Sequence, residues 1–310
     1  MDYKRKLFLC RSYYHLMIAV SKSFTDPENS LICCVKEEFD EQEIDKIIIN
    51  CEAFGLEIVT ISQKEKTYEL DFKYHDTLFL FHWAVHKNPE RSFFNEFEKK
   101  NVILIEDGAT HHEVFRSQKY TKTRIIKNII NFITTGNLYV ENSKRIKEIL
   151  VTFPDKYPIN IQKKMKKLSL HISNEDEIDM YMKIFNVAYS VDIDPTRKRA
   201  IVFTQPLSED GFVSEGIKKE MYFDIFKDLF HDGYEIYLKQ HPREISNYED
   251  EISNFNIINL PQNFPGELIN FMGFQIDKAI SICSGVVYNI TANERIQLNE
   301  NFFVENKKKR

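Results

Sequence analysis

Short, continuous apolar runs alternate along the first third of the chain with longer stretches in which apolar side chains recur every three or four positions. The runs have the length and continuity of strands buried on both faces of a parallel sheet, and the longer stretches have the period of amphipathic helices. The strand candidates are residues 7–10, 31–35, 77–81 and 102–105, and the helix candidates are residues 11–23, 39–54 and 88–100. Alternating strands and helices predict an α/β fold with right-handed crossovers.

The same alternation restarts after a polar, proline-containing segment at residues 192–199. Here the strand candidates are residues 200–204, 235–239, 257–260 and 278–283, and the helix candidates are residues 216–230, 248–255 and 266–272. We therefore predict two Rossmann-like domains, residues 1–195 and 196–310, that face each other across a cleft lined by the carboxyl ends of their strands.

The composition supports packed cores and excludes several classes of protein. Of the 310 residues, 43% are hydrophobic and 29% are charged, which argues against disorder. The formal net charge of -5 does not suit a nucleic-acid binder. The sequence holds only 9 glycines and neither a G-x-G-x-x-G nor a Walker-type G-x-x-x-x-G-K motif, so the common phosphate-binding loops are absent.

The cysteines and the termini bear on where the protein works. Five cysteines without a C-x-x-C pair indicate buried thiols in a reducing compartment. No signal sequence and no run of about 18 apolar residues is present, so we expect a cytoplasmic protein. We expect the basic tail Lys307–Arg310 to be exposed to solvent. The alternative is that it binds weakly to the anionic inner surface of the membrane. Residues 120–140 are rich in Ile and basic side chains. We expect them to form either an ordinary amphipathic helix or a surface for homodimer or membrane contact.

Four polar motifs directly follow predicted strands. They are Glu106-Asp107-Gly108, the segment from Gln205 to Gly211, His241-Pro242-Arg243 and Cys283-Ser284-Gly285. Each by itself can be an ordinary turn. Together they lie where the cleft of an open α/β sheet is lined, so we interpret them as one site.

These side chains suit group transfer from a phosphate-activated donor. A carboxylate at the rim of one domain can remove the proton of an acceptor hydroxyl, and a histidine on the other can protonate or bind the departing phosphate. A Ser-Gly turn offers a hydroxyl and backbone N–H groups to the same phosphate. We expect no metal or other cofactor, because these groups together balance the leaving charge.

The ordered set Glu106-Asp107-Gly108, His241-Pro242 and Ser281–Ser284 resembles the motifs of bacterial sialyltransferases of glycosyltransferase families 38, 52 and 80. Residues 201–207 and the chain length look most like family 52, and the resemblance covers residues 100–290. It implies a GT-B-like fold and an inverting sialyltransferase with CMP-sialic acid as donor. The implied acceptor is a terminal galactose of a surface glycan such as capsule or lipooligosaccharide.

The resemblance also implies a role for each matching residue. Asp107 would act as the base, His241 as the acid or the phosphate partner, and Ser284 as a ligand of the CMP phosphate. Glu267 would contact the ribose hydroxyls. The other residues expected at the donor site are Gly108, Gln205, Pro242, Cys283 and Gly285.

Two departures from the family pattern affect this assignment. Cys283 stands where the relatives have a hydroxyl side chain, which removes one expected contact to the donor. Asp210 belongs to a second acidic-acidic-Gly motif and competes with Asp107 for the role of base.

Other histidines have metal-compatible spacing. His82 and His86 are four residues apart, but no glutamate follows His82, so structural or acceptor-side roles are favoured. Residues 111–113 (His-His-Glu) could bind a metal together with Asp107 in a hydrolase, and an acceptor-side or capping role is again favoured.

Further alternatives stay open. Residues 11–15 follow the first strand and either contact the acceptor or simply begin a helix. The nearest alternative function is transfer of another CMP-activated sugar. From a different class of protein, the chain could be a non-catalytic subunit of a polysaccharide assembly complex.

Overall fold

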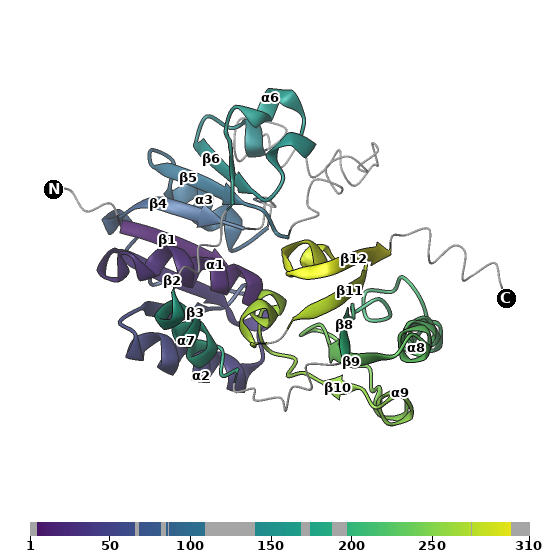
Figure 1. Ribbon diagram of the computed structural model, residues 1–310. Coiled ribbons are helices and arrows are strands. Elements are labelled where there is room, and N and C mark those ends of the chain that lie inside the picture. Colours follow the sequence, from purple (N-terminus) through teal and green to yellow (C-terminus); the bar gives the residue numbers. More distant parts are fainter. Residues whose placement is uncertain are drawn as a thin grey trace. The chain divides into compact units, whose positions relative to one another are not determined.

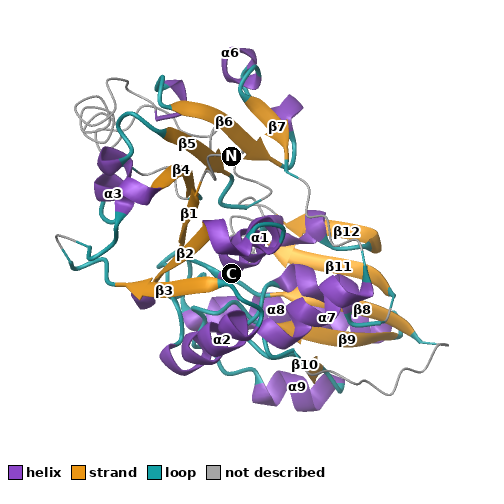
Figure 2. Ribbon diagram, turned by 90° about the vertical axis from the view of Figure 1, so that its left-hand side faces the viewer, coloured by secondary structure: helices purple, strands orange, loops and turns teal. Residues whose placement is uncertain are grey.

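The computed structural model describes residues 5–65, 68–81, 85, 87–108, 140–168, 174–187, 197–273 and 275–298. The chain divides into two compact units, Met1–Asn186 and Val187–Arg310, so the division lies nearer the N-terminus than the boundary predicted after residue 195. Near the end of the first unit, helix α7 (Glu175–Ile184) packs beside α2 (Glu41–Ala53), as Figures 1 and 2 both show. Most of the predicted linker lies outside the described residues, and its last two residues begin a strand of the second unit.

In the first unit, the described residues form a seven-stranded parallel sheet in the order β3-β2-β1-β4-β5-β6-β7 (Figure 1). The strands are β1 (Arg5–Cys10), β2 (Ser30–Val35), β3 (Glu57–Ile61), β4 (His75–Leu80), β5 (Asn101–Ile105), β6 (Ile146–Val151) and β7 (Met165–Lys167). Leu7 of β1 lies opposite Leu31 on one side and Leu78 on the other. The four apolar runs predicted as strands in this half are confirmed.

Three of the helices described in this unit lie where the pattern predicted them, at residues 11–23, 39–54 and 88–100, and two others were not predicted. Besides α2 and α7, the helices are α1 (Tyr13–Phe24), α3 (Glu90–Glu96) and α6 (Ile159–Gln162), with 3-10 turns η1 (Pro27–Asn29), η2 (Lys36–Glu38), η3 (Phe72–Tyr74), η4 (Val140–Asn142) and η5 (Pro154–Lys156). Helix α1 packs on β1 and β2, α2 on β3 and α3 on β4. The helix predicted at 88–100 is shorter, because it begins after Pro89 and its backbone leaves the helical region at Phe97.

The second unit is a five-stranded parallel sheet in the order β10-β9-β8-β11-β12, again within the described residues. The strands are β8 (Lys198–Phe203), β9 (Tyr234–Lys239), β10 (Ile258–Asn259), β11 (Ile276–Ile282) and β12 (Ala292–Leu298). The helices are α8 (Glu215–His231) and α9 (Glu249–Phe255), and the 3-10 segments are η6 (Gly266–Phe271) and η7 (Gly285–Asn289).

One predicted helix of this unit is a 3-10 helix and not an α-helix. Residues 266–272 form η6, with i to i+3 bonds from Leu268 N–H to Pro265 O and from Met272 N–H to Ile269 O. Leu268 and Ile269 of this segment are both fully buried.

Each unit has its own core between its sheet and its helices, which confirms the predicted α/β architecture of two Rossmann-like units. Leu7, Leu78 and Val102 are buried in the first core, and Val202 and Ile280 are buried in the second. Because the strands of each sheet are parallel, their carboxyl ends share one edge. The polar motifs of the sequence lie at these two edges.

Candidate functional site

His241 follows β9 at the carboxyl edge of the second sheet. Its Nδ1 accepts a hydrogen bond from the backbone N–H of Arg243 at 3.1 Å. A ring nitrogen that accepts carries no proton, so the neutral ring holds its proton on Nε2. Burial and the nearby charges of Arg243 and Lys239 lower the pKa of His241 to about 4. At neutral pH the side chain is therefore an uncharged hydrogen-bond donor.

Asp210 contacts Arg243, which is the second residue after this histidine. Both carboxylate oxygens of Asp210 accept hydrogen bonds from the Arg243 guanidinium, at 3.0 and 3.1 Å. The pair stays in contact with solvent, with 35% of the Asp210 side chain and 52% of the Arg243 side chain exposed. This two-point contact ties the loop after β8 to the loop after β9.

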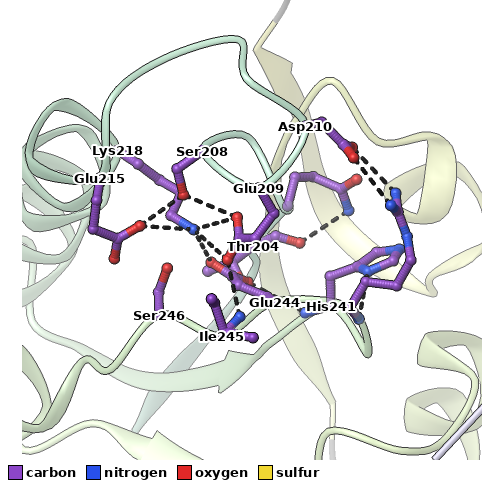
Figure 3. Close-up of polar contacts among 12 residues, drawn as sticks. Thr204, Ser208, Glu209, Asp210, Glu215, Lys218, His241, Glu244, Ile245 and Ser246 are labelled. Carbon is purple, nitrogen blue, oxygen red and sulfur yellow. Dashed lines mark hydrogen bonds and ion pairs between the residues drawn. The ribbon is translucent and has the colours of Figure 1, made fainter.

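A buried ammonium group contacts carboxylates of the same two loops (Figure 3). Lys218 of α8 is fully buried and donates to both carboxylate oxygens of Glu209, at 3.0 and 2.8 Å. It also forms ion pairs with Glu215 and Glu244, each at 3.3 Å. Burial alone would raise the pKa of Glu209, but hydrogen bonds from Lys218 and from the Ile245 N–H lower it to about 2.

Glu244 anchors the loop that carries His241. Its carboxylate accepts hydrogen bonds from the hydroxyl groups of Thr204 and Tyr248. Thr204 directly follows β8 and Glu244 follows His241 by three residues, so these contacts fix the histidine loop to the end of the neighbouring strand. The sequence pattern did not reveal Lys218 or Glu244 as site residues, because their partners are distant along the chain.

The serine motif forms a defined turn after β11. Ser284 Oγ accepts a hydrogen bond from the Val286 N–H at 3.3 Å, and Ser281 Oγ–H donates to the Ser284 carbonyl at 2.7 Å. Cys283 has a φ of 56°, a left-handed backbone that few side chains other than glycine adopt. Gly285 is buried at the start of η7. Ser284 therefore stands at the same sheet edge as His241, with its backbone held by several contacts.

Glu267 lies in η6 and is nearly buried. Its Oε1 accepts a hydrogen bond from Asn289 Nδ2 at 3.1 Å, and burial raises the pKa of its carboxyl group. The preceding Gly266 packs so closely that a Cβ there would lie 2.9 Å from side-chain atoms of Phe203 and Val286. The missing side chain lets the turn carrying Glu267 rest against the ends of β8 and η7.

Two other residues predicted at the donor site occupy the same edge. The Gln205 backbone N–H donates to the Tyr222 hydroxyl at 2.9 Å, and its side-chain amide donates to the Thr204 carbonyl at 2.9 Å. Pro242 is half-buried next to His241. The second unit thus brings together every predicted donor-site residue except Gly108, which belongs to the first unit.

Asp107 follows β5 at the carboxyl edge of the first sheet. Its side chain is 46% exposed, and its Oδ1 lies 2.6 Å from Nε2 of His15. Gly108 has a φ of 144°, which favours glycine at this position.

Glu106, the first acid of this motif, points into the protein instead. It is fully buried, the Thr152 hydroxyl donates to it, and burial raises its pKa to about 7. Within the described part of the chain, its Oε2 has no hydrogen-bond partner. Asp107 is therefore the residue of the pair that is accessible for chemistry.

His15 and Arg11 are site residues that the sequence pattern left undecided. Arg11 follows β1 and donates to Glu90 at 2.5 Å and to Glu38 at 2.6 Å, so it links the end of β1 to the start of α3 and to η2. His15 is only 2% exposed, and its ring stacks on Phe81 with the centroids 4.5 Å apart. The sequence did contain one signal for His15, since a histidine in the first turn after a predicted strand lies near the carboxyl edge of the sheet.

The alternatives that rest on metals concern other parts of the chain. The described ranges hold no group of three or more His, Cys, Asp or Glu side chains arranged to bind a metal ion. His82, His86 and residues 111–113 lie outside the described residues, as do most of 120–140 and the basic tail. Among the helices that the structure describes, none has the length and apolar character needed to cross a bilayer.

Known structures resemble this chain in fold. A variant of the wall teichoic acid polymerase TagF matches with a TM-score of 0.54 at 14% identity, covering 93% of this chain and 68% of that chain. The structure of S. aureus MnaA with UDP matches with a TM-score of 0.50 at 6% identity, covering 92% of this chain and 75% of that chain. These likenesses show a GT-B-type fold.

Sequence relatives narrow the assignment. An uncharacterized protein of Haemophilus influenzae strain Rd is 25% identical over 203 residues. The match covers 62% of this chain and 60% of that protein, so the chain spans less than two thirds of this relative. The family model for alpha-2,8-polysialyltransferases matches residues 6–292. The prediction of a bacterial sialyltransferase is confirmed at this level, and the narrower assignment to family 52 stays a prediction. The chain belongs to the alpha-2,8-polysialyltransferase family.

Proposed function

We propose that the chain transfers sialic acid from CMP-sialic acid to a hydroxyl group of a bacterial surface glycan, with inversion and without a metal ion. Capsule and lipooligosaccharide are the glycans we favour, and the reaction takes place in the cytoplasm near the inner face of the membrane. The family match supports sialyl transfer. The main structural support for the proposed CMP-sialic acid site is His241. Its Nδ1 accepts a hydrogen bond, which leaves the Nε2–H to bind a phosphate, and the Arg243 guanidinium follows two residues later.

The donor side needs groups that accept a departing phosphate. A phosphate monoester has a second pKa of about 6, so CMP leaves as an anion without prior protonation. The uncharged His241 fits the role of phosphate partner better than that of acid, because its pKa of about 4 keeps it unprotonated at neutral pH. Ser284 supplies a hydroxyl, Arg243 supplies positive charge, and Glu267 contacts the ribose hydroxyls.

The transfer itself is one displacement. The acceptor hydroxyl gives its proton to the Asp107 carboxylate while its oxygen forms a bond to the anomeric carbon. The bond between that carbon and the phosphate oxygen breaks, and its electron pair leaves with CMP, which inverts the anomeric centre. Asp107 suits the base role better than Asp210, since both oxygens of Asp210 are held by Arg243.

The acceptor has two candidates. The motif resemblance favours a terminal galactose. The name of the matching family, alpha-2,8-polysialyltransferase, favours a glycan that already ends in sialic acid. CMP release measured with each acceptor class decides between them.

The donor class is tested by ligand-dependent stability. A ligand that binds only the folded protein raises its melting temperature. We expect CMP to raise the Tm more than UDP, GDP or ADP at equal concentration. Stabilisation by UDP alone would overturn the sialyl donor, and CMP binding without turnover on either acceptor would favour a non-catalytic subunit.

The base is tested by two matched substitutions at saturating donor. We expect Asp107→Asn to lower kcat by about 100- to 10,000-fold, because the acceptor proton loses its base. Asp210→Asn should keep a larger share of the turnover. Loss of turnover in Asp210→Asn alone would show that Asp210 is the base.

A further inference from the structure

His15 is a buried histidine that holds an exposed carboxylate. It lies in the first turn of α1, directly after the carboxyl end of β1, and only 2% of its side chain is exposed. Asp107 follows β5, and 46% of its side chain is exposed. The distance of 2.6 Å between His15 Nε2 and Asp107 Oδ1 joins a residue of the protein interior to the proposed base.

The backbone fixes which ring nitrogen carries the proton. His15 Nδ1 accepts a hydrogen bond from the Arg11 backbone N–H at 3.2 Å. Since an accepting nitrogen has no proton, the neutral ring holds its hydrogen on Nε2 and donates it to Asp107. This is the geometry in which an imidazole orients a carboxylate.

Further contacts fix the ring and the backbone around it. Ser12 caps α1 by accepting the His15 backbone N–H at 3.2 Å, so the helix starts at a defined residue. The ring stacks on Phe81 at an interplanar angle of 16°. The Arg11 side chain, bound to Glu90 and Glu38, holds the segment that provides the N–H for Nδ1. A rigid donor of this kind restricts the rotation of the Asp107 carboxylate.

We propose that His15 is the positioning residue of the catalytic base: it orients the Asp107 carboxylate toward the acceptor hydroxyl. This inference rests on the proposed function, in which Asp107 takes the acceptor proton. In the transfer step the proton passes from the hydroxyl to Asp107, the glycosidic bond forms and the bond to CMP breaks. His15 keeps its Nε2–H throughout and exchanges no proton.

The experiment compares variants of the full-length protein with CMP-sialic acid and the acceptor it uses. His15→Leu keeps the volume and removes the donor, so we expect kcat to fall about 10- to 100-fold while the KM for CMP-sialic acid stays the same. His15→Gln carries an N–H near the position of Nε2 and should recover most of that loss. In the double variant with Asp107→Asn, His15→Leu should cost nothing further, because His15 acts through Asp107.

The matched control is His75→Leu, which removes another buried histidine of the same unit. His75 begins β4, and its Nδ1 contacts the Asp71 carbonyl, so it lies at the amino edge. We expect it to lower stability without lowering kcat. An equal loss of kcat in His75→Leu would assign the effect to destabilisation and overturn the proposal.

The remaining outcomes separate this inference from the proposed function. Wild-type kcat in His15→Leu, or additive losses in the double variant, would overturn the positioning role and leave sialyl transfer intact. Full turnover in Asp107→Asn would overturn the base and the positioning role together. If His15→Leu does not fold, His15→Gln and the ¹⁵N spectrum of wild-type imidazoles decide, since a proton on Nδ1 of His15 would overturn the proposal.

Discussion

Lys218 places one positive charge among three carboxylates in the second unit. The side chains of Lys218 and Glu244 are fully buried, and 15% of the Glu209 side chain is exposed. Lys218→Met would remove the counter-ion of all three carboxylates, two of which are buried or nearly buried, so we expect the free energy of unfolding to fall by about 3–5 kcal/mol. Urea unfolding measures this loss. Lys227→Met, on the exposed face of the same helix, should change stability by less than about 0.5 kcal/mol.

The same cluster predicts an acid-sensitive contribution to stability. Glu209 has its pKa lowered from 4.5 to about 2 in the folded protein, so its contacts stabilise fully above the unfolded pKa. The contribution is lost as the pH falls from about 4.5 to about 2. Burial raises the pKa of Glu244 above its usual value. The carboxyl group of Glu244 therefore lowers the stability as the pH rises above its unfolded pKa, which is the opposite direction to Glu209. Glu209→Gln should therefore unfold with a flatter pH dependence in this window, and an unchanged slope in urea titrations would contradict the prediction.

At the scale of elements, apolar runs identified most of the inner strands. They missed β6, which lies between β5 and β7, and the edge strands β3, β7 and β12. Eight predicted strands are present, because strands buried on both faces need continuous apolar sequence. Edge strand β12 reads Ala-Asn-Glu-Arg-Ile-Gln-Leu and is partly exposed, and edge strand β7 reads Met-Lys-Lys. Such strands are held by backbone pairing to one neighbour, so their side chains carry little signal.

The site was predictable to the extent that it follows from the ends of strands. Asp107, His241 and Ser284 directly follow predicted strands and lie at the carboxyl edges. The pairing of His15 with Asp107 depends on the order β1-β4-β5, which apolar patterns do not specify. The contact between Asp210 and Arg243 likewise joins two loops that are distant in sequence. Local pattern therefore predicted which residues reach the edge, and strand order decided which of them meet.

The turn into η6 yields a prediction for a whole element. Gly266→Ala brings a Cβ within 2.9 Å of Phe203 and Val286, so η6 and its Glu267 must shift. We expect a loss of stability of about 1–3 kcal/mol, as for overpacked cores, together with weaker CMP binding. The matched control is Gly216→Ala in α8, where a Cβ meets no atom within 4 Å and should be neutral or slightly stabilising. Calorimetric titration with CMP compares the two, and equal affinities would contradict the role of this turn.

At the scale of the whole molecule, the two units divide the chemistry. The residues proposed to bind the donor, His241, Arg243, Ser284 and Glu267, all belong to Val187–Arg310, and Asp107 with its partner His15 belongs to Met1–Asn186. Each unit also has its own buried core. A unit with its own core can in principle fold alone, so we expect each unit to fold independently.

Residues 187–310, produced alone, should unfold cooperatively in urea and show selective stabilisation by CMP. The proposed donor-binding residues other than Gly108, and the cluster around Lys218, all lie within this unit. The same fragment should release no CMP from CMP-sialic acid when acceptor is added, because it lacks the base. Residues 1–186 serve as the control and should show no response to CMP. A folded 187–310 fragment that fails to bind CMP would show that donor binding also requires the first unit, and would move part of the donor site to the edge that carries Asp107 and Gly108.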